Sequence, residues 1–303
     1  MSDFLLRLTK AAKDPERIKT GEPMKQHTTF RTGGPAAYFV SPSCTEELSA
    51  VIKLCRQEHM PYYILGNGSN LLISDKGYEG VIISMEEGFS QIQNEGTRIR
   101  AGAGALLSRI ARQALASSLT GFEFAAGIPG TLGGAVVMNA GAYGGEMKQV
   151  LISARVLTGE GEVKAISGEE LELGYRTSCI QREGYIVLSA LLQLQQGDKS
   201  SIQARMEELA EKRKEKQPLE YPSAGSTFKR PEGWFAGKLI EDAGLKGFSV
   251  GGAQVSEKHC GFVINRGNAT SSDIVELCRQ VRDRVKDQFG VELEMEIKRL
   301  GEF

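Results

Sequence analysis

The sequence has little of what marks a disulfide-bonded, zinc-binding or membrane-embedded protein. Its five cysteines are odd in number, widely separated and never arranged as Cys-x-x-Cys, which argues against a disulfide framework or a zinc site. The three histidines, at positions 27, 59 and 259, show no ligand spacing, so we expect no metal. No apolar run reaches the roughly 18 residues that a membrane span requires.

An excess of one charge is missing as well. Thirty-seven basic and thirty-eight acidic residues leave a formal net charge of −1, which excludes the global field that gathers nucleic acid or anionic membrane. The N-terminal segment is too charged to carry the apolar core of a secretory signal. Because the cysteines also suit a reducing compartment, we expect a cytoplasmic protein with neither nucleic acid nor membrane as a partner.

What is present is the composition of an ordinary globular protein. Hydrophobic residues make up 41% and charged residues 25% of the 303 positions. This length exceeds the ~250 to 300 residues at which one hydrophobic core usually stops growing. The chain is therefore expected to form two or three structural units.

Helical and strand periodicities alternate along the chain. Residues 45–59 place apolar side chains on one helical face before Pro61. Apolar strands at 62–65 and 71–74 then flank a glycine-rich loop, an alternation typical of α/β structure. Farther along, the patterns predict helices over 107–115, 198–217 and 271–289, a helix after Trp234, and strands over 97–101, 151–157, 185–194, 259–265 and 291–299.

The first glycine-rich loop, GNGSN at residues 66–70, lies between two apolar strands. Its glycines would let the backbone approach a ligand closely, and consecutive N–H groups can form an anion-binding nest for a pyrophosphate. A hairpin turn accounts for the same pentapeptide equally well. The loop alone leaves both interpretations open.

The second loop, GIPGTLGGAVVMNAGAYG at residues 127–144, contains more glycine than a helix or strand interior tolerates. It offers a tight Pro-Gly turn and then a helix start whose free N–H groups and dipole would favour phosphate. The alternative is a close helix crossing that needs small residues. Two phosphate-type loops suggest one large nucleotide, while the absence of GxGxxG and GxxxxGK[ST] disfavours the dinucleotide fold and the P-loop.

Three further positions are candidates for chemistry. Arg176, in YRTS, is either a fixed positive charge for a carboxylate or enolate or a surface arginine. Ser226 lies in AGSTFKRP, which has the composition of an anion clamp and equally of a polar turn. It is not expected to be a hydrolase nucleophile, because GxSxG is absent. Glu296 falls on the charged face of the alternating segment 291–299, and periodicity alone makes that face solvated.

In combination, these segments resemble those of the UDP-N-acetylenolpyruvoylglucosamine reductase family, flavoenzymes of bacterial cell-wall precursor synthesis. The match runs nearly from end to end, and the series in this order is more specific than any one motif. It rests on HTTFRTGGPA (27–36), LGNGSNLL (65–72), GIPGTLGGAVVMNAGAYG (127–144), YRTS (175–178), AGSTFKRP (224–231), AGKLIEDAGLKG (236–247), GGAQVS (251–256) and GVELEMEIKRLG (290–301).

The resemblance implies an α+β fold in which a two-subdomain FAD-binding region of the vanillyl-alcohol-oxidase type precedes a smaller α/β substrate-binding domain. The expected boundaries are 1–85 and 86–198 for the two FAD-binding subdomains and 199–290 for the substrate-binding domain. The C-terminal strand, 291–303, is expected to return to the first subdomain. Because the stretch after YRTS lacks a longer tyrosine-bearing loop, the chain resembles the shorter, second type of the family.

The resemblance also implies a reaction. NADPH reduces the flavin and leaves, and UDP-N-acetylglucosamine enolpyruvate enters the same cleft. A hydride then passes from flavin N5 to the enolpyruvyl methylene carbon, which gives UDP-N-acetylmuramate. By motif, Arg176 and Glu296 would polarise the substrate carboxylate and stabilise the enolate, and Ser226 would donate the proton. On this basis the solvated interpretation of Glu296 is set aside.

FAD is expected to bind noncovalently, because GNGSN and its immediate neighbours contain no histidine for attachment. The expected FAD-binding residues come from both loops: Gly66, Asn67, Gly68, Ser69, Asn70, Leu71, Gly127, Ile128, Pro129, Gly130, Gly133, Gly134, Asn139, Ala140, Gly141 and Ala142. Candidate contacts to the substrate diphosphate or sugar, each equally consistent with a surface role, are Lys216, Lys229, Arg230, Gln254 and His259.

Two other functions compete with this one. One is another FAD-dependent oxidase or dehydrogenase of the same fold that acts on an alcohol or a sugar. The other is a catalytically silent nucleotide-binding protein that keeps the fold. The motifs around Arg176, Ser226 and Glu296 favour the reductase. A monomer is expected, with NADPH and UDP-N-acetylglucosamine enolpyruvate as its partners.

Overall fold

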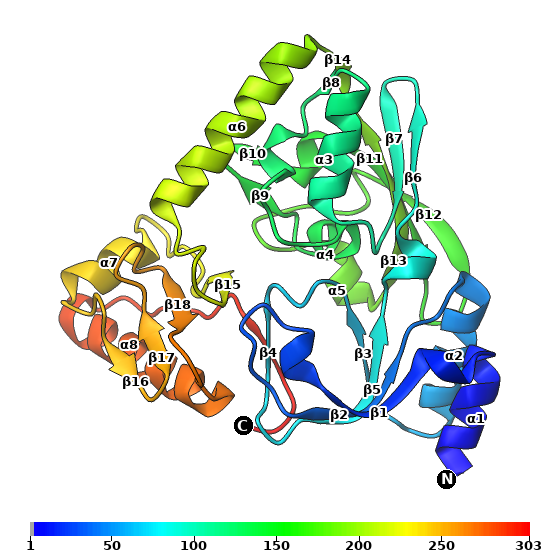
Figure 1. The fold of residues 1–303 in the computed structure, drawn as a ribbon, viewed down its shortest axis with the longest axis horizontal. Helices are drawn as coiled ribbons and strands as arrows, with labels where there is room; N and C mark the ends of the chain where they lie inside the picture. Colours follow the sequence, from blue (N-terminus) through cyan, green and yellow to red (C-terminus); the bar gives the residue numbers. More distant parts are fainter. Residues whose placement is uncertain (1–2) are drawn as a thin grey trace. The chain divides into compact units, whose positions relative to one another are not determined.

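The computed structural model describes residues 3–303, which divide into two compact units. Unit 1 comprises the described part of Met1–Lys19 together with Phe39–Asn67 and Gly80–Arg213. Unit 2 comprises Thr20–Tyr38, Gly68–Glu79 and Lys214–Phe303. Each unit is therefore assembled from segments that lie far apart in the sequence (Figure 1). The three-domain division expected from the sequence stays a prediction.

Two helices and a parallel strand pair begin unit 1. Helix α1 (Asp3–Ala12) packs against α2 (Thr45–Gln57). Strand β3 (Tyr62–Leu65) pairs in parallel with β5 (Tyr78–Ser84). The helix predicted over 45–59 is confirmed, because its apolar face is the buried one, with Leu48, Val51, Ile52 and Cys55 in the core.

The largest sheet of unit 1 has five antiparallel strands in the order β12-β11-β13-β7-β6. Alternating burial along the strands puts one face against helices α3 and α4. The elements of this layer are β6 (Ile92–Glu95), β7 (Arg98–Gly102), α3 (Leu107–Ala116), α4 (Leu132–Val137), β11 (Leu151–Leu157), β12 (Val163–Ser167) and β13 (Ile186–Gln193).

Smaller elements complete unit 1 around that sheet. Two short antiparallel pairs, β9 with β10 and β8 with β14, close the connections. Helix α6 (Lys199–Lys216), the predicted boundary helix, buries only Ile202 and Leu209. The remaining elements are η1 (Pro15–Arg17), η3 (Glu87–Phe89), β8 (Leu119–Thr120), η4 (Glu123–Ala125), β9 (Gly141–Ala142), β10 (Gly145–Glu146), η5 (Met147–Gln149), α5 (Cys179–Glu183) and β14 (Gln195–Gln196).

Unit 2 is built around a four-stranded antiparallel sheet in the order β15-β18-β17-β16, packed against two helices. Helix α8 (Ser271–Phe289) starts at a capping box made by Thr270 and Asp273 and ends at the left-handed Gly290. Its apolar stripe, including Leu277 and Val281, lies in the core. The other elements are β15 (Ser223–Ser226), α7 (Ala236–Asp242), β16 (Ser249–Val250), β17 (Ala253–Val255) and β18 (Phe262–Asn265).

Two N-terminal strands and the chain's last strand also belong to unit 2 in part. Strands β1 (Ile18–Pro23) and β2 (Pro35–Val40) are neighbours in one sheet, joined through η2 (Met24–Gln26). Strand β4 (Leu71–Ile73) pairs in parallel with β19 (Lys298–Leu300). The last strand comes from the end of the sequence yet lies beside the segment that follows the first glycine-rich loop (Figure 1).

The strand predicted over 291–299 is longer than the one that the structure contains. Only Lys298–Leu300 forms a ladder, and within 291–297 Met295 makes a single isolated bridge to Phe228. Strict alternation of apolar and charged residues suggested a continuous strand, but its backbone partners come from two different segments: residues 294–296 bond to 227–229, and 298–300 pair with β4. Periodicity does not report where backbone partners exist.

Within residues 3–303, no helix is both long and apolar enough to cross a membrane.

The core of unit 2 should be sensitive to a cavity in α8. Leu277 is fully buried, so Leu277→Ala is expected to lower the free energy of unfolding by about 2 to 5 kcal/mol. Urea denaturation followed by circular dichroism measures this value. Arg282→Ala, at an exposed position of the same helix, should change it by no more than about 0.5 kcal/mol. Equal effects of the two substitutions would contradict the packing described here.

Candidate functional site

The two glycine-rich loops meet within unit 1. The Asn67 side-chain amide donates to the Pro129 carbonyl at 2.8 Å. A Cβ added at Gly66 would overlap the Thr131 hydroxyl. Glycine is therefore required at position 66 because the second loop approaches its backbone too closely for a side chain. The structure brings together two of the segments that the sequence assigned to one nucleotide.

The second half of the first loop belongs to unit 2. Gly68 has φ +59°, and an added Cβ would overlap the His27 carbonyl. The Gly68 carbonyl accepts a hydrogen bond from the Thr29 N–H at 3.2 Å. The tight backbone turn in this loop, and not a ligand alone, therefore accounts for this glycine. Of the other predicted residues, Leu71 is buried at the start of β4.

The start of α4 differs from the expectation of free N–H groups. The Leu132 N–H donates to the Ala105 carbonyl at 2.9 Å, and the Gly133 N–H donates to the Ala103 carbonyl at 2.8 Å. Gly133 is also close-packed, since an added Cβ would lie 3.0 Å from the Ala103 Cβ. The interpretation of this helix start as an open phosphate site was wrong for these two groups, because a neighbouring strand end uses them.

Gly134 is the residue in this helix that protein packing does not explain. It is exposed, and an added Cβ would meet nothing nearer than 3.8 Å. Glycine inside a helix costs about 1 kcal/mol relative to alanine, so an unpacked glycine here calls for another reason. Close approach of a ligand to the backbone supplies one, and FAD fits the residues present at this point.

The end of the second loop is tied to the turn that carries Arg176. Asn139 is buried, and its amide donates to the Glu146 carboxylate at 2.9 Å and to the Gly174 carbonyl at 3.1 Å. Its amide oxygen accepts from the Lys148 N–H at 2.9 Å. The Asn139 side chain thus has a structural role. Its predicted contact with FAD, like those of Ala140, Gly141 and Ala142, stays a prediction.

Arg176 has a backbone conformation that is uncommon outside glycine. It has φ +55° in a turn closed by reciprocal hydrogen bonds between Gly174 and Thr177, and Ser178 holds the turn to the Val137 carbonyl at 2.8 Å. Its guanidinium lies 5.2 Å from the centre of the Tyr175 ring. Left-handed non-glycine residues are enriched at functional sites, so the geometry favours more than a surface role.

Arg213 is a candidate that the sequence analysis missed. It lies on α6 with its guanidinium packed against Gly127, where an added Cβ would come within 3.0 Å of Nη1. Burial lowers the pKa of Arg213, and the charge of Tyr143 opposes the shift. A signal was present, because the spacing of the apolar residues Ile202, Met206 and Leu209 continues to position 213.

Ser226 and Glu296 are brought together in unit 2. Between Ser223 and Ser226 the pairing of β15 with β18 shifts by one residue, and Gly225 has φ +73° at this bulge. After the bulge, the Thr227 carbonyl accepts from the Glu296 N–H at 2.9 Å. The Lys229 N–H donates to the Glu294 carbonyl at 2.8 Å. The proposed proton donor thus lies on a segment paired with that of the proposed carboxyl group.

Glu296 is buried, in contrast to its neighbours on the same predicted face. Its exposed fraction is 9%, whereas the side chains of Glu292 and Glu294 are 69% and 71% exposed. The solvated interpretation from periodicity was therefore wrong for Glu296. The Asn70 amide contributes to its position by donating to the Glu296 carbonyl at 3.2 Å, and the Asn70 carbonyl accepts from the Lys298 N–H at 3.1 Å.

The five predicted substrate-binding residues differ in their exposure and in the protein groups that they contact. Lys216 is exposed at the end of α6. Lys229 pairs with Glu294 at 2.5 Å. The Arg230 guanidinium lies 3.8 Å from the centre of the Phe235 ring. The Gln254 amide donates within its hairpin, to the Gly247 carbonyl at 3.0 Å and the Ser249 hydroxyl at 3.1 Å. These contacts with substrate stay predictions.

His259 is held in one tautomer by the backbone. Its Nδ1 accepts from the Gly261 N–H at 3.1 Å, so the proton of the neutral ring lies on Nε2. The ring packs edge-on to Phe262 with centres 5.0 Å apart. Burial lowers the pKa of His259, and a backbone hydrogen bond and the Glu241 charge oppose that shift. The side chain is a neutral donor at neutral pH.

Comparison with known families gives two matches along the chain. Residues 36–167 match a model described as an FAD binding domain. Residues 217–300 match the C-terminal domain of UDP-N-acetylenolpyruvoylglucosamine reductase. Both glycine-rich loops lie within the first match, and Ser226 and Glu296 lie within the second.

Proteins similar over the full length carry one name. The chain is 56% identical to the UDP-N-acetylenolpyruvoylglucosamine reductase of Lachnoclostridium phytofermentans, over 100% of this chain and 99% of that protein. It is 55% identical to the enzyme of the same name from Agathobacter rectalis, over 93% of each. The crystal structure of the Thermus caldophilus reductase matches with a TM-score of 0.80 and 37% identity, over 94% of this chain and 98% of that one.

A more distant likeness concerns the fold alone. A variant of Phl p 4 described as a glucose oxidase matches with a TM-score of 0.51 at 12% identity, over 65% of this chain and 45% of that one. With the FAD-binding match, it confirms the expected α+β fold with an FAD-binding region of the vanillyl-alcohol-oxidase type.

The contact between the loops can be tested by a paired substitution. Gly66→Ala should lower both the flavin content of the purified protein and its melting temperature, because the new methyl group overlaps the Thr131 hydroxyl. Gly66→Ala combined with Thr131→Ala should regain much of both, whereas Gly66→Ala with Thr131→Ser should not. Absorbance at 450 nm relative to 280 nm and differential scanning calorimetry provide the readouts. If both double variants behave alike, the overlap is not the cause.

The depressed pKa of His259 predicts a pH dependence of stability. In the unfolded chain the ring takes up a proton near the ordinary value of 6.5, whereas the folded protein keeps it neutral to lower pH. The stability contribution is therefore present above pH 6.5 and is lost as pH falls toward the folded pKa. His259→Asn, which keeps an acceptor for Gly261, should reduce the loss of unfolding free energy between pH 7.5 and 5.5. His59→Asn, at an exposed position, is the control that should not.

Proposed function

The chain belongs to the UDP-N-acetylenolpyruvoylglucosamine reductase family, and on this premise we propose that it reduces UDP-N-acetylglucosamine enolpyruvate to UDP-N-acetylmuramate in peptidoglycan precursor synthesis. The main support is the 56% identity that extends over the full chain and includes both the flavin-binding and the C-terminal parts. The oxidase alternative is less well supported, because the likeness to a Phl p 4 variant at 12% identity over 65% of the chain concerns the fold and not the substrate.

The proposed enzyme uses FAD with NADPH as reductant. When bound, FAD supplies two-electron chemistry, since it can take a hydride from NADPH and pass it to the enolpyruvyl methylene carbon. The residues proposed to hold it noncovalently are those of the two glycine-rich loops, with Gly134 as the position where protein packing does not account for a bare backbone. Arg213, packed against Gly127, adds a cation suited to a phosphate group.

Ser226 is the proposed proton donor. Hydride addition to the methylene carbon leaves negative charge on the adjacent carbon and its carboxylate, and this carbanion needs one proton to complete the reduction. A serine hydroxyl is a poor acid in water, so it can act only beside a strongly basic centre and with a route for its own reprotonation. The bulge at Gly225 fixes the backbone from which Ser226 projects.

Glu296 and Arg176 are proposed to stabilise the developing enolate. A guanidinium does this by charge and by paired N–H donors. A carboxyl group stabilises an enolate only as a proton donor, and Glu296 is buried in unit 2. Arg176 belongs to unit 1, so its part in this group rests on the resemblance of YRTS to the family motif.

The finer proposals concern binding, assembly and location. Lys216, Lys229, Arg230, Gln254 and His259 are proposed to contact the substrate diphosphate or sugar. Arg230 and the neutral His259 are supported by their place beside an aromatic ring and their donor groups. We further propose that the protein is cytoplasmic, because its nucleotide-linked substrate and NADPH are found in the cytoplasm. We also propose that it is a monomer.

The role of Ser226 separates the two half-reactions. Ser226→Ala should leave flavin reduction by NADPH nearly unchanged, because that step needs no proton from this residue. Reoxidation by UDP-N-acetylglucosamine enolpyruvate should slow by about 10²- to 10⁴-fold. Anaerobic stopped-flow absorbance follows both steps in the flavin band. Ser223→Ala, on the same strand, is the matched control and should retain both rates. An equal loss of both rates in Ser226→Ala would contradict the role of Ser226 as proton donor.

A further inference from the structure

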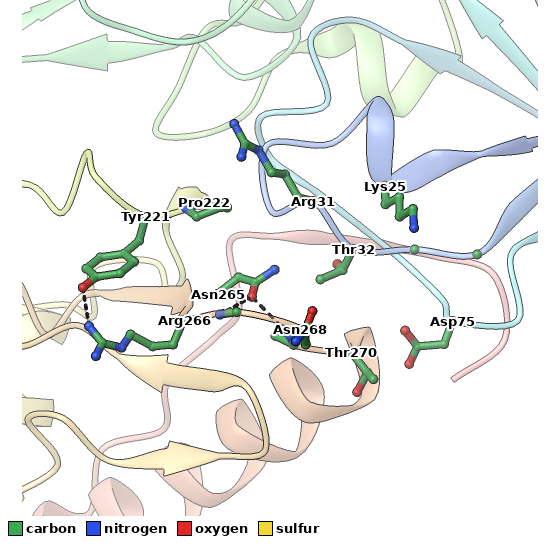
Figure 2. A pocket seen from close by; sticks show the side chains of 14 residues that line it. Lys25, Arg31, Thr32, Asp75, Tyr221, Pro222, Asn265, Arg266, Asn268 and Thr270 are labelled. Carbon is green, nitrogen blue, oxygen red and sulfur yellow. Dashed lines mark hydrogen bonds between the residues drawn. The ribbon is translucent and has the colours of Figure 1, made fainter.

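A groove of about 620 Å³ lies within unit 2, and none of the residues that line it is among those assigned above to FAD, substrate or catalysis. Figure 2 shows its walls: Lys25, Arg31 and Thr32 come from the segment between β1 and β2, and Tyr221, Asn265 and Arg266 from the C-terminal part. This volume lies within the range of small-ligand sites, about 300 to 1,000 Å³, and exceeds what a single phosphate needs.

The groove carries an excess of positive charge. Three cations line it, Lys25, Arg31 and Arg266, against one carboxylate, Asp75. Both oxygens of Asp75 are engaged at the start of α8, where they accept from the backbone N–H groups of Ser271 and Ser272 at 2.7 and 2.8 Å. Among the side chains that the structure describes, no carboxylate forms an ion pair with any of the three cations.

Arg266 is held in a defined orientation. Its guanidinium donates to the Tyr221 hydroxyl and lies 4.8 Å from the centre of the Tyr221 ring. The dashed line in Figure 2 marks this hydrogen bond. An arginine fixed in this way loses less conformational entropy when it binds an anion than a freely moving one. The Tyr221 ring also presents an aromatic surface beside the charge.

Buried polar groups fix the floor of the groove. Asn265 is buried, donates to the Phe30 carbonyl at 3.0 Å, and accepts from the N–H groups of Gly267 and Ala269 at 3.0 and 3.1 Å. Ser271, fully buried, donates to the Ile73 carbonyl at 2.6 Å. These bonds join the two walls of the groove within unit 2, so the site is preformed.

Two backbone features support a binding role. Arg31 and Asn268, which both line the groove, have φ +56°. Such conformations cost free energy outside glycine and are retained where they position a group. Solvated surface cations would need neither this backbone nor the Arg266–Tyr221 bond.

From these observations we propose that the groove binds a diphosphate anion, either inorganic pyrophosphate or the diphosphate of a nucleotide. Cations from two segments line the groove, Lys25 and Arg31 on one and Arg266 on the other, which suits an anion with charges on two phosphorus centres, and the Tyr221 ring offers an aromatic surface that a nucleoside could use. This proposal does not rest on the reductase activity, because none of the groove residues has a part in it.

Isothermal titration of the flavin-saturated protein tests the proposal, with inorganic pyrophosphate and ADP as separate probes. Saturation with FAD keeps ADP out of the proposed flavin site. Binding is expected for pyrophosphate and should weaken between 20 and 200 mM NaCl, because the cations are exposed and are screened by salt. Arg266→Gln should weaken it at least about fivefold through loss of a charged hydrogen-bond donor.

Matched variants locate the site. Arg282→Gln, an exposed arginine elsewhere in unit 2, should leave binding unchanged, and Arg31→Gln should weaken it as Arg266→Gln does. Melting temperatures close to that of the parent would establish that the variants are folded. Tighter binding of ADP than of pyrophosphate, lost in Tyr221→Leu, would assign a nucleotide; equal binding would assign the diphosphate group alone. Absence of binding, or binding unaffected by Arg31→Gln and Arg266→Gln, overturns the proposal.

Discussion

Thr227 is the residue on which the arrangement of the C-terminal site depends. It is fully buried and bonds to two other segments: its N–H donates to the Gly261 carbonyl, its hydroxyl accepts from the Val263 N–H and its carbonyl accepts from the Glu296 N–H, each at 2.9 Å. Because every polar group of this residue has a partner, its backbone cannot shift without leaving one unpaired, at a cost of about 1 to 3 kcal/mol. The positions of Ser226 and Glu296 follow from that constraint.

The glycines that carry the flavin-binding segments are alike in sequence but differ in physical purpose. Gly66 is bare because the Thr131 hydroxyl approaches it, and Gly68 because of its positive φ and the nearby His27 carbonyl. Gly134, by contrast, has open space where a side chain would project. A motif that looks uniform therefore combines loop-to-loop packing, turn geometry and one position that protein contacts leave unexplained. Only the last of these points directly to a ligand.

Features that depend on neighbouring residues in the sequence could be predicted more accurately than features that depend on distant segments. The helix over 271–289 has its own cap, stripe and terminal glycine, and the structure reproduces it residue for residue. The strand predicted over 291–299 was wrong in extent, because alternation does not supply a continuous backbone partner and only Lys298–Leu300 forms a ladder. Glu296 was misassigned by periodicity for the same reason, since its burial comes from segments more than sixty residues away in the sequence. Arg213 was overlooked because it lies on helix α6, whose residues are almost entirely polar.

The sequence by itself determined the family, the fold class and the identity of the cofactor, because an ordered series of motifs across the full chain is specific even where each motif is ambiguous. It also determined most helices, whose periodicity and caps are local. Tertiary structure decided which motif residues serve packing and which are left for a ligand, and it brought the Ser226 and Glu296 segments together. It also assembled a cationic groove from Lys25, Arg31 and Arg266. Contacts between distant segments are set by packing and hydrogen bonding, which no local pattern encodes.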